Sequence, residues 1–125
     1  MIFGIGTDIV QVQRMAKNLE KYGDRFAKRI LSDGEFSEFS ENSNQSAFLA
    51  KRFAAKEAAV KALGTGFRHG ISMQHISVGH DEVGKPVLQF TDVAESIFNE
   101  RLIQSSHISI ADEKEFAVAY VVLEI

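Results

Sequence analysis

The 125-residue sequence contains no cysteine and no tryptophan, and it has a single proline. Without cysteine the chain can form neither a disulfide framework nor a thiolate metal site. This absence fits a reducing compartment, and we expect a cytoplasmic protein. No apolar run approaches the roughly 20 residues of a membrane helix. The first ten residues also lack the basic region and cleavage site of a signal peptide, so we expect no contact with a membrane.

An excess of positive charge is absent as well. The chain has 14 Lys and Arg residues against 17 Asp and Glu residues, a net charge of -3. This balance argues against broad nucleic-acid binding, and an anionic partner would need a local basic patch. Apolar residues make up 45% of the chain and charged residues 25%, as in an ordinary globular protein. At this length we expect one domain, residues 1–125, with one hydrophobic core.

Hydrophobic periodicity and turn residues predict an α+β chain with the order β-α-α-α-β-β-α-β-β. The first strand, 2–10, is apolar on both faces, which predicts burial in the core. A glycine follows the first and third helices, and Ser32 with Glu35 forms a capping box for the second. The expected helices are 11–22, 32–41, 46–63 and a helix from Asp92 to about 104. The later strands are expected at 73–79, 86–90, 107–111 and 116–124.

Asp8 is a carboxylate inside the apolar first strand, on the same face as Gly4 and Gly6. Its burial would cost several kcal/mol without a compensating group. Asp8 can therefore be the cap of the helix that begins near Gln11, or it can be a metal ligand or catalytic carboxylate. The two glycines favour the second interpretation, because they let another element or a ligand come close.

Lys56 falls in the middle of the apolar stripe of the 46–63 helix. A buried amine needs a compensating anion, and Glu57 alone cannot neutralise the cationic residues of this helix. We predict an anionic ligand, plausibly phosphate; a chloride, or a lysine stem that reaches water, would also resolve the conflict. Glu57 and Lys61 are four residues apart, which by itself describes an exposed helix pair worth about 0.2–0.5 kcal/mol.

Two further regions carry positive character. The loop after the helix, Gly64, Thr65 and Gly66, is followed by Arg68 and His69, and exposed glycine amides would suit an anion, although this is no Walker motif. A second region has Lys or Arg at helical spacing, which is either a solvated face or a docking site for an acidic protein. It consists of Arg14, Lys17, Lys21, Arg25 and Lys28.

Two segments together resemble the holo-acyl-carrier-protein synthases, the small bacterial branch of the 4′-phosphopantetheinyl transferases. They are "GIGTDIV" at 4–10 and "RFAAKEAAVKALGTG" at 52–66. The similarity extends to "LSDGEF", "DEVGKP" and "HISIADEKEFAVA", and so covers the length of the chain. It implies a small domain with a mostly antiparallel sheet packed against the long central helix.

The resemblance also implies a reaction: transfer of the phosphopantetheine arm of coenzyme A to a serine of apo-acyl carrier protein. Adenosine 3′,5′-bisphosphate is released, and the product serves fatty acid biosynthesis. In this family the carboxylates that match Asp8 and Glu57 hold Mg²⁺. Lys56 and Lys61 are expected near the phosphates or the transferred proton. The family is typically a homotrimer with active sites between subunits, and its partner is acidic, which suits the basic residues above.

Several assignments stay open at this stage. The larger transferases have a second acidic residue where this chain has Val10, and a water could take that place. A metal-bound water, Glu57, Lys61 or His107 could remove the serine proton. Besides the 64–66 loop, Lys85 and Pro86, just after Gly84, are expected to contact the nucleotide. The alternative to an enzyme is a docking module that uses the basic residues without a metal; a nucleic-acid binder is less favoured, because aromatic and basic residues are not interleaved.

Overall fold

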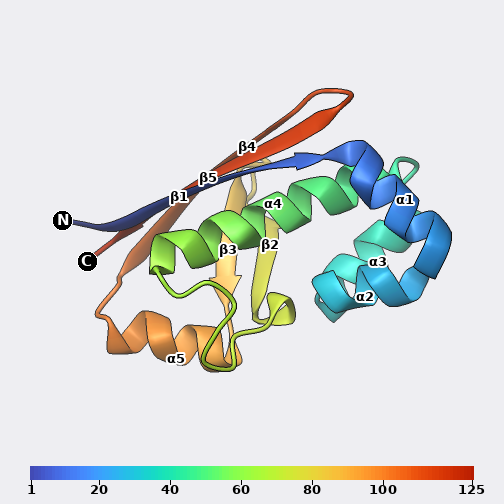
Figure 1. Cartoon of the computed structure of the whole chain (residues 1–125). Coiled ribbons are helices and arrows are strands. Elements are labelled where there is room, and N and C mark those ends of the chain that lie inside the picture. The colour runs from blue at the N-terminus through green and yellow to red at the C-terminus, as the bar shows by residue number, and fades with distance from the viewer.

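The computed structural model describes all 125 residues, which form five strands and five α-helices; the strands and the four shorter helices surround the long helix α4 (Gln45–Leu63) (Figure 1). The strands are β1 (Ile2–Gln11), β2 (Ile76–His80), β3 (Pro86–Phe90), β4 (Ser105–Asp112) and β5 (Phe116–Glu124). The helices are α1 (Val12–Tyr22), α2 (Asp24–Ile30), α3 (Asp33–Glu41), α4 (Gln45–Leu63) and α5 (Asp92–Glu100). The predicted α+β class is confirmed.

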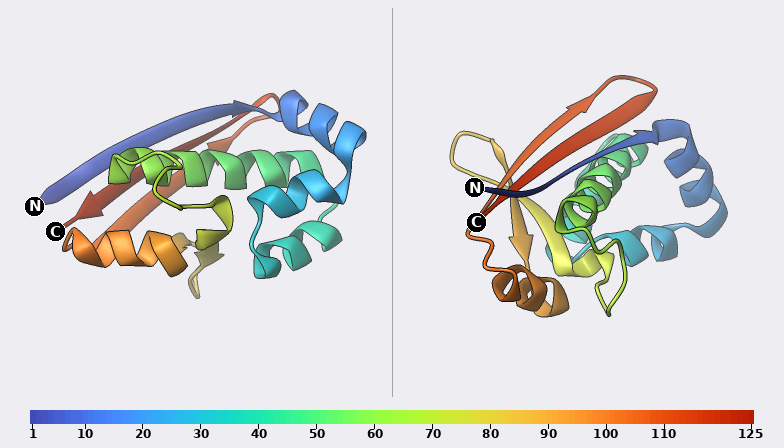
Figure 2. Two further views of the ribbon diagram at one scale, coloured as in Figure 1. Left: turned by 60° about the horizontal axis from the view of Figure 1, so that its bottom comes forward. Right: turned by 60° about the vertical axis from the view of Figure 1, so that its left-hand side comes forward.

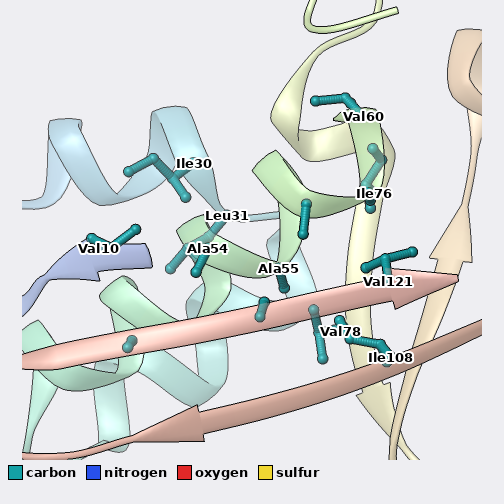
Figure 3. Close-up of a cluster of buried hydrophobic side chains, with 14 of the residues drawn as sticks. Val10, Ile30, Leu31, Ala54, Ala55, Val60, Ile76, Val78, Ile108 and Val121 are labelled. Atoms are coloured by element: carbon teal, nitrogen blue, oxygen red, sulfur yellow. The ribbon is translucent and has the colours of Figure 1, made fainter. Parts of the chain in front are cut away.

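An antiparallel sheet of three strands, in the order β1-β5-β4, packs along α4. Strands β2 and β3 form a second, two-stranded sheet. Figure 2 shows α1, α2 and α3 gathered around the amino-terminal half of α4, at the opposite end of the molecule from the two termini. The interior is one cluster of 26 buried apolar residues from α4, both sheets and the surrounding helices (Figure 3). None of the helices combines the length and the hydrophobicity that a membrane span requires.

The register of the main sheet separates an inner face, against α4, from an outer face. Gly6 pairs with Val121, and Asp8 pairs with Ala119; Val121 and Ala119 are completely buried. The alternate positions point away from α4, and Ile5 and Ile9 are 56% and 62% exposed. The prediction that the first strand is buried on both faces is therefore wrong: its apolar outer face lies on the surface of the single chain.

Two glycines let β1 lie directly on the backbone of α4. A Cβ atom on Gly4 would be 2.1 Å from the carbonyl oxygen of Ala62, and one on Gly6 would be 2.0 Å from that of Ala58. Both distances are far below ordinary contact, so no residue with a side chain fits either place. This close approach brings the residues that follow Gly6 on the inner face of β1 next to the side chains of α4.

Several element boundaries differ from the sequence prediction. Gly23, with φ of 64°, separates α1 from α2, and the seven-residue α2 was not predicted. Residues 73–75 form a 3₁₀ turn before β2. Helix α5 ends at Glu100, and it begins after Thr91 with no side-chain cap. The capping box of α3 and the left-handed residue Gly64, which ends α4, are confirmed.

Candidate functional site

Asp8 and Lys61 join β1 to α4 by direct contact. The Lys61 ammonium donates hydrogen bonds to the Asp8 Oδ1 atom at 3.1 Å and to the Thr7 carbonyl at 3.0 Å. The Asp8 side chain is 17% exposed and that of Lys61 is 51% exposed, so both reach solvent. The alternative in which Asp8 caps the following helix is wrong, because Gln11 is the residue at that position and α1 has no side-chain cap.

Glu57 lies one helical turn before Lys61 and is half-buried. Its pKa is raised above the ordinary value of 4.5, first because burial disfavours the charge and second because of the negative charge of Asp8; Lys61 and Arg14 act in the opposite direction. No hydrogen bond or ion pair within the chain uses the Glu57 carboxylate. The structure thus brings together three of the predicted site residues, and leaves two mutually repelling carboxylates at the surface.

This arrangement fits a hard divalent cation. The chain contains no group of three or more His, Cys, Asp or Glu side chains that could hold a metal ion. Val10, at the position of the acidic residue in the larger transferases, is buried in the core at 1% exposure and can supply no ligand. Mg²⁺ is commonly bound through one or two carboxylates, with water and substrate phosphates completing its shell. Asp8 and Glu57 match that pattern, and a cation between them would remove their repulsion.

Lys56 does not face a ligand. Its ammonium is completely buried and donates to the Glu35 Oε1 atom at 2.5 Å, to the Ile30 carbonyl at 2.7 Å and to the Met73 carbonyl at 3.0 Å. These three bonds use every ammonium hydrogen. Burial lowers the pKa of Lys56, and the charge of Glu35 opposes that shift. The predicted phosphate or chloride partner of Lys56 is therefore wrong, because the compensating anion is the carboxylate of Glu35.

The same carboxylate explains a second cation of α4. The Arg52 Nε atom lies 3.4 Å from the Glu35 Oε2 atom, an ion pair without hydrogen-bond geometry. Oε2 also accepts the backbone N–H of Val78 at 2.9 Å. The sequence pattern around Glu35 predicts only the capping box, which uses the Oε1 atom. The burial of Glu35 had one signal in the sequence: this acidic residue lies four positions before Phe39, on the same face of the helix.

The glycine loop after α4 does not form the predicted anion cradle. The backbone N–H groups of Gly64, Thr65 and Gly66 all donate to the Val60 carbonyl, at 3.0, 3.2 and 3.3 Å. The Thr65 hydroxyl donates to the Gly66 carbonyl. The loop closes the carboxyl end of α4, whose dipole repels an anion. Its amides are used within the chain, so the prediction that they cradle phosphate is wrong.

Three other predicted site residues lie away from Asp8 within one chain. Lys85 lies in the turn between β2 and β3, where its backbone N–H donates to the Asp81 carboxylate, and Pro86 is the first residue of β3 in the second sheet. His107 is on the outer face of the main sheet, opposite to Asp8, in the same row as Val122. Its Nε2 atom is 2.6 Å from the Glu124 carboxylate, and this bond lowers the pKa of Glu124.

The basic residues are all exposed, but they do not form one continuous helical stripe, because Gly23 divides them between α1 and α2. Beside them is an apolar groove of about 350 Å³ that sequence analysis missed. Arg14 lies near both the groove and Glu57. Its guanidinium is 5.4 Å from the centre of the Phe53 ring, which lines the groove, and its positive charge opposes the rise in the pKa of Glu57. The groove is lined by Phe26, Arg29, Ile30, Phe53, Phe67, Ile71, Ser72 and Met73.

Comparison with known proteins gives a consistent result. Residues 4–121 match the model of the 4′-phosphopantetheinyl transferase superfamily. A holo-[acyl-carrier-protein] synthase of Nitrosospira multiformis is 49% identical over 124 residues, 99% of each chain. The crystal structure of the holo-[acyl-carrier-protein] synthase from Neisseria meningitidis is 42% identical, with a TM-score of 0.95 over 100% of both chains. That of a holo-(acyl-carrier-protein) synthase from Bacillus anthracis in complex with CoA (3′,5′-ADP) is 41% identical, with a TM-score of 0.81 over 99% of this chain and 97% of that one.

Proposed function

The chain belongs to the 4′-phosphopantetheinyl transferase superfamily, and we propose that it transfers the phosphopantetheine arm of coenzyme A to a serine of apo-acyl carrier protein. The serine oxygen attacks the phosphorus that bears the pantetheine arm. The bond from that phosphorus to the bridging oxygen breaks, and adenosine 3′,5′-bisphosphate leaves. The observation that carries the proposal is the group formed by Asp8, Glu57 and Lys61, in a chain whose relatives are holo-acyl-carrier-protein synthases.

We assign Asp8 and Glu57 to the binding of Mg²⁺. When bound, this ion polarises the phosphoryl oxygens and offsets the charge that develops on the leaving phosphate. Lys61 adds a fixed ammonium group beside Asp8, where the transition state gains negative charge; such preorganised charge is a common source of rate enhancement. The hydrogen bonds from Lys61 to Asp8 and to the Thr7 carbonyl hold this ammonium in place before substrate arrives.

The same contacts reduce the number of residues that could accept the serine proton. The Lys61 ammonium donates hydrogen bonds to an anion and a carbonyl within the chain. Glu57 has no hydrogen bond within the chain and a raised pKa, which makes it a stronger base than an ordinary carboxylate. Within one chain Glu57 is therefore the better base only while it does not bind the metal, because a bound cation lowers the basicity of a carboxylate. His107 can serve only if a neighbouring subunit presents it to the site.

The outer face of the main sheet supports a homotrimer with active sites between subunits. Large apolar side chains gather there without a partner, and exposed patches of this kind mark protein interfaces. His107 lies on this same face, so a subunit contact through the sheet could bring it close to a neighbour's carboxylates. The exposed apolar residues of this face are Ile5, Ile9, Phe116, Val118 and Tyr120.

The exposed cations of α1 and α2, together with the apolar groove, suit an acidic helical protein such as acyl carrier protein. Opposite charges speed the encounter of two proteins and fix their orientation. An amphipathic helix of the partner can place its apolar side chains in the groove and its carboxylates beside the cations. We place the enzyme in fatty acid biosynthesis, in the cytoplasm, because acyl carrier protein is the carrier of that pathway.

The direct test is mass spectrometry of apo-acyl carrier protein incubated with the enzyme, coenzyme A and Mg²⁺. We expect the carrier protein to gain the mass of one phosphopantetheine arm, and the gain to stop when a chelator removes the metal. The competing function, a docking module for an acidic protein, is favoured by the groove and the basic residues alone. It predicts binding that a chelator does not change and no gain of mass under any metal or pH.

Reversing two charges of the docking surface should weaken carrier-protein recognition. In the variant K17E/K21E we expect the KM for acyl carrier protein to rise about tenfold or more, because steering by opposite charge is lost, with a small effect on kcat. The dependence of kcat/KM on salt should flatten at the same time. The matched control is K114E, the same reversal in the exposed turn between β4 and β5. Equal KM values for the two variants would place the docking surface elsewhere.

A further inference from the structure

One buried ion pair joins five segments of the chain. The Glu35 carboxylate receives the Lys56 ammonium from α4, the Ser32 backbone N–H at the start of α3 and the Val78 N–H of β2. The Lys56 ammonium also binds the carbonyls of Ile30 and Met73. Ile30 is the last residue of α2, and Met73 is the first residue of the 3₁₀ turn. The pair therefore fixes α2, α3, the 3₁₀ turn and β2 to the middle of α4.

The two carbonyls that Lys56 binds belong to the walls of the apolar groove. Ile30 lines it from α2, Met73 from the 3₁₀ turn, and Phe53 from α4, one turn before Lys56. The carboxyl end of a helix leaves carbonyl groups without a partner in the helix, and Lys56 occupies that of Ile30. A single side chain thus sets the distance between both walls of the groove and the helix that forms its floor.

The next residue of the same helix is Glu57. Its carboxylate lies on the side of α4 that faces Asp8, whereas the Lys56 side chain points into the core. The groove and Glu57 are therefore held by neighbouring positions of one helix, and Asp8 lies beside this helix on β1. A partner seated in the groove would have a fixed position relative to Asp8 and Glu57 only while the walls of the groove stay attached to α4.

We propose that Lys56 is a positioning residue for the carrier protein: it fixes the groove between α2 and the 3₁₀ turn relative to the carboxylates that act on the phosphate. This inference rests on the proposed function and assigns the groove to the acidic partner. The three hydrogens of the Lys56 ammonium are used within the chain, so this group has none left to bind coenzyme A. Its removal acts on the docking of the protein substrate and leaves the recognition of coenzyme A intact.

The test is the variant K56M, which keeps an unbranched side chain only one atom shorter and removes the ammonium. We expect the KM for apo-acyl carrier protein, and its Kd measured by calorimetry without coenzyme A, to rise about tenfold. The KM for coenzyme A and the Mg²⁺ concentration that gives half-maximal rate should change less than about twofold. A loss confined to stability, with the KM for the carrier protein unchanged, would overturn the proposal.

Because K56M leaves Glu35 without its cation, a second variant keeps the test valid if K56M does not fold. The variant K56M/E35Q removes both charges, and the single glutamine oxygen can still accept the Val78 N–H, whereas the Ser32 N–H, which uses the other carboxylate oxygen, loses its side-chain acceptor. We expect it to fold and to keep the raised KM and Kd for the carrier protein, since the carbonyls of Ile30 and Met73 stay unbound. Recovery of wild-type KM and Kd values would overturn the proposal.

A core variant distant from the groove controls for stability alone. Leu123 is completely buried and pairs with Gly4 near the end of the sheet; we expect L123A to be destabilised but to keep the wild-type KM for the carrier protein. If L123A raises this KM as much as K56M does, Lys56 has only a structural role. The wild-type protein distinguishes a failure of the proposed function from a failure of this inference. If it neither modifies nor binds the carrier protein, both are refuted. If it transfers normally and K56M has wild-type KM and Kd values for the carrier protein, the inference alone is refuted.

Discussion

Replacement of Asp8 or Glu57 by alanine should lower the rate of phosphopantetheine transfer by about three orders of magnitude or more, because either change removes one of the two protein ligands of the metal. Asp8 also holds the Lys61 ammonium, so D8A loses two sources of positive charge near the phosphates. We therefore expect D8A to be at least as defective as E57A. The measurement is the initial rate of mass gain by the carrier protein at saturating Mg²⁺. Wild-type rates in both variants would contradict the metal site.

The thermal stability of a Glu57 variant shows whether a loss of activity comes from a loss of fold. The folded chain raises the pKa of Glu57, so it binds the proton more tightly than the unfolded chain does. Ionised Glu57 thus disfavours the folded state, and this contribution grows as pH rises from the ordinary pKa of 4.5 through the raised one. In E57Q this fall in stability is absent. At about pH 8, E57Q should melt at a higher temperature than the wild type, and at about pH 4 the difference should disappear.

The residues of this site could be singled out because each signal is local in the sequence, and the family resemblance predicted that Asp8 and Glu57 act together. Asp8 is a single charge between apolar residues, and the glycines before it predict a close approach. Glu57 and Lys61 share one edge of a strongly predicted helix. A nearby cation stabilises a half-buried carboxylate, and the antiparallel packing of β1 along α4 places Lys61 beside Asp8. This contact was not predicted from the sequence.

The partner of Lys56 could not be predicted in the same way. Glu35 is 21 residues earlier in the chain, and its local pattern is fully explained by the capping box. The carboxylate that pairs with the buried lysine is determined by how α3 packs against α4. Hydrophobic periodicity describes single elements and does not predict such long-range packing. The prediction that the 64–66 loop binds an anion was wrong for a different reason. When a glycine loop follows a helix, its backbone N–H groups bind the last carbonyl groups of that helix.

The helices and strands were predicted where a hydrophobic repeat extends over many residues, and they were missed where the segment is short. Helix α2 has seven residues, too few for a clear apolar repeat. The exposure of Ile5 and Ile9 is a further limit of one chain's sequence. A strand that is apolar on both faces predicts that both faces are covered, and within this chain only the inner face is covered, by α4. That outer face is the reason to expect His107 to act, if it acts, across a subunit boundary.

The close packing of β1 on α4 predicts the second large effect. The substitution G6A places a Cβ atom 2.0 Å from the Ala58 carbonyl oxygen and 2.7 Å from the Ala62 backbone nitrogen. Both are backbone atoms of a helix and cannot move aside alone. We expect a loss of about 3 kcal/mol or more in the free energy of unfolding, at the upper end for overpacked sites, measured by urea denaturation.

The same substitution should also reduce activity under conditions in which G6A remains folded. Asp8 lies two residues beyond Gly6 on the same face, so moving β1 away from α4 separates Asp8 from Glu57 and Lys61. The matched control is G34A: Gly34 lies in α3 with open space around its Cβ position, and the change should stabilise the chain slightly, as alanine does in helices. If G6A folds and reacts like the wild type, β1 and α4 do not need backbone contact, and the distance between the two carboxylates is set by some other part of the fold.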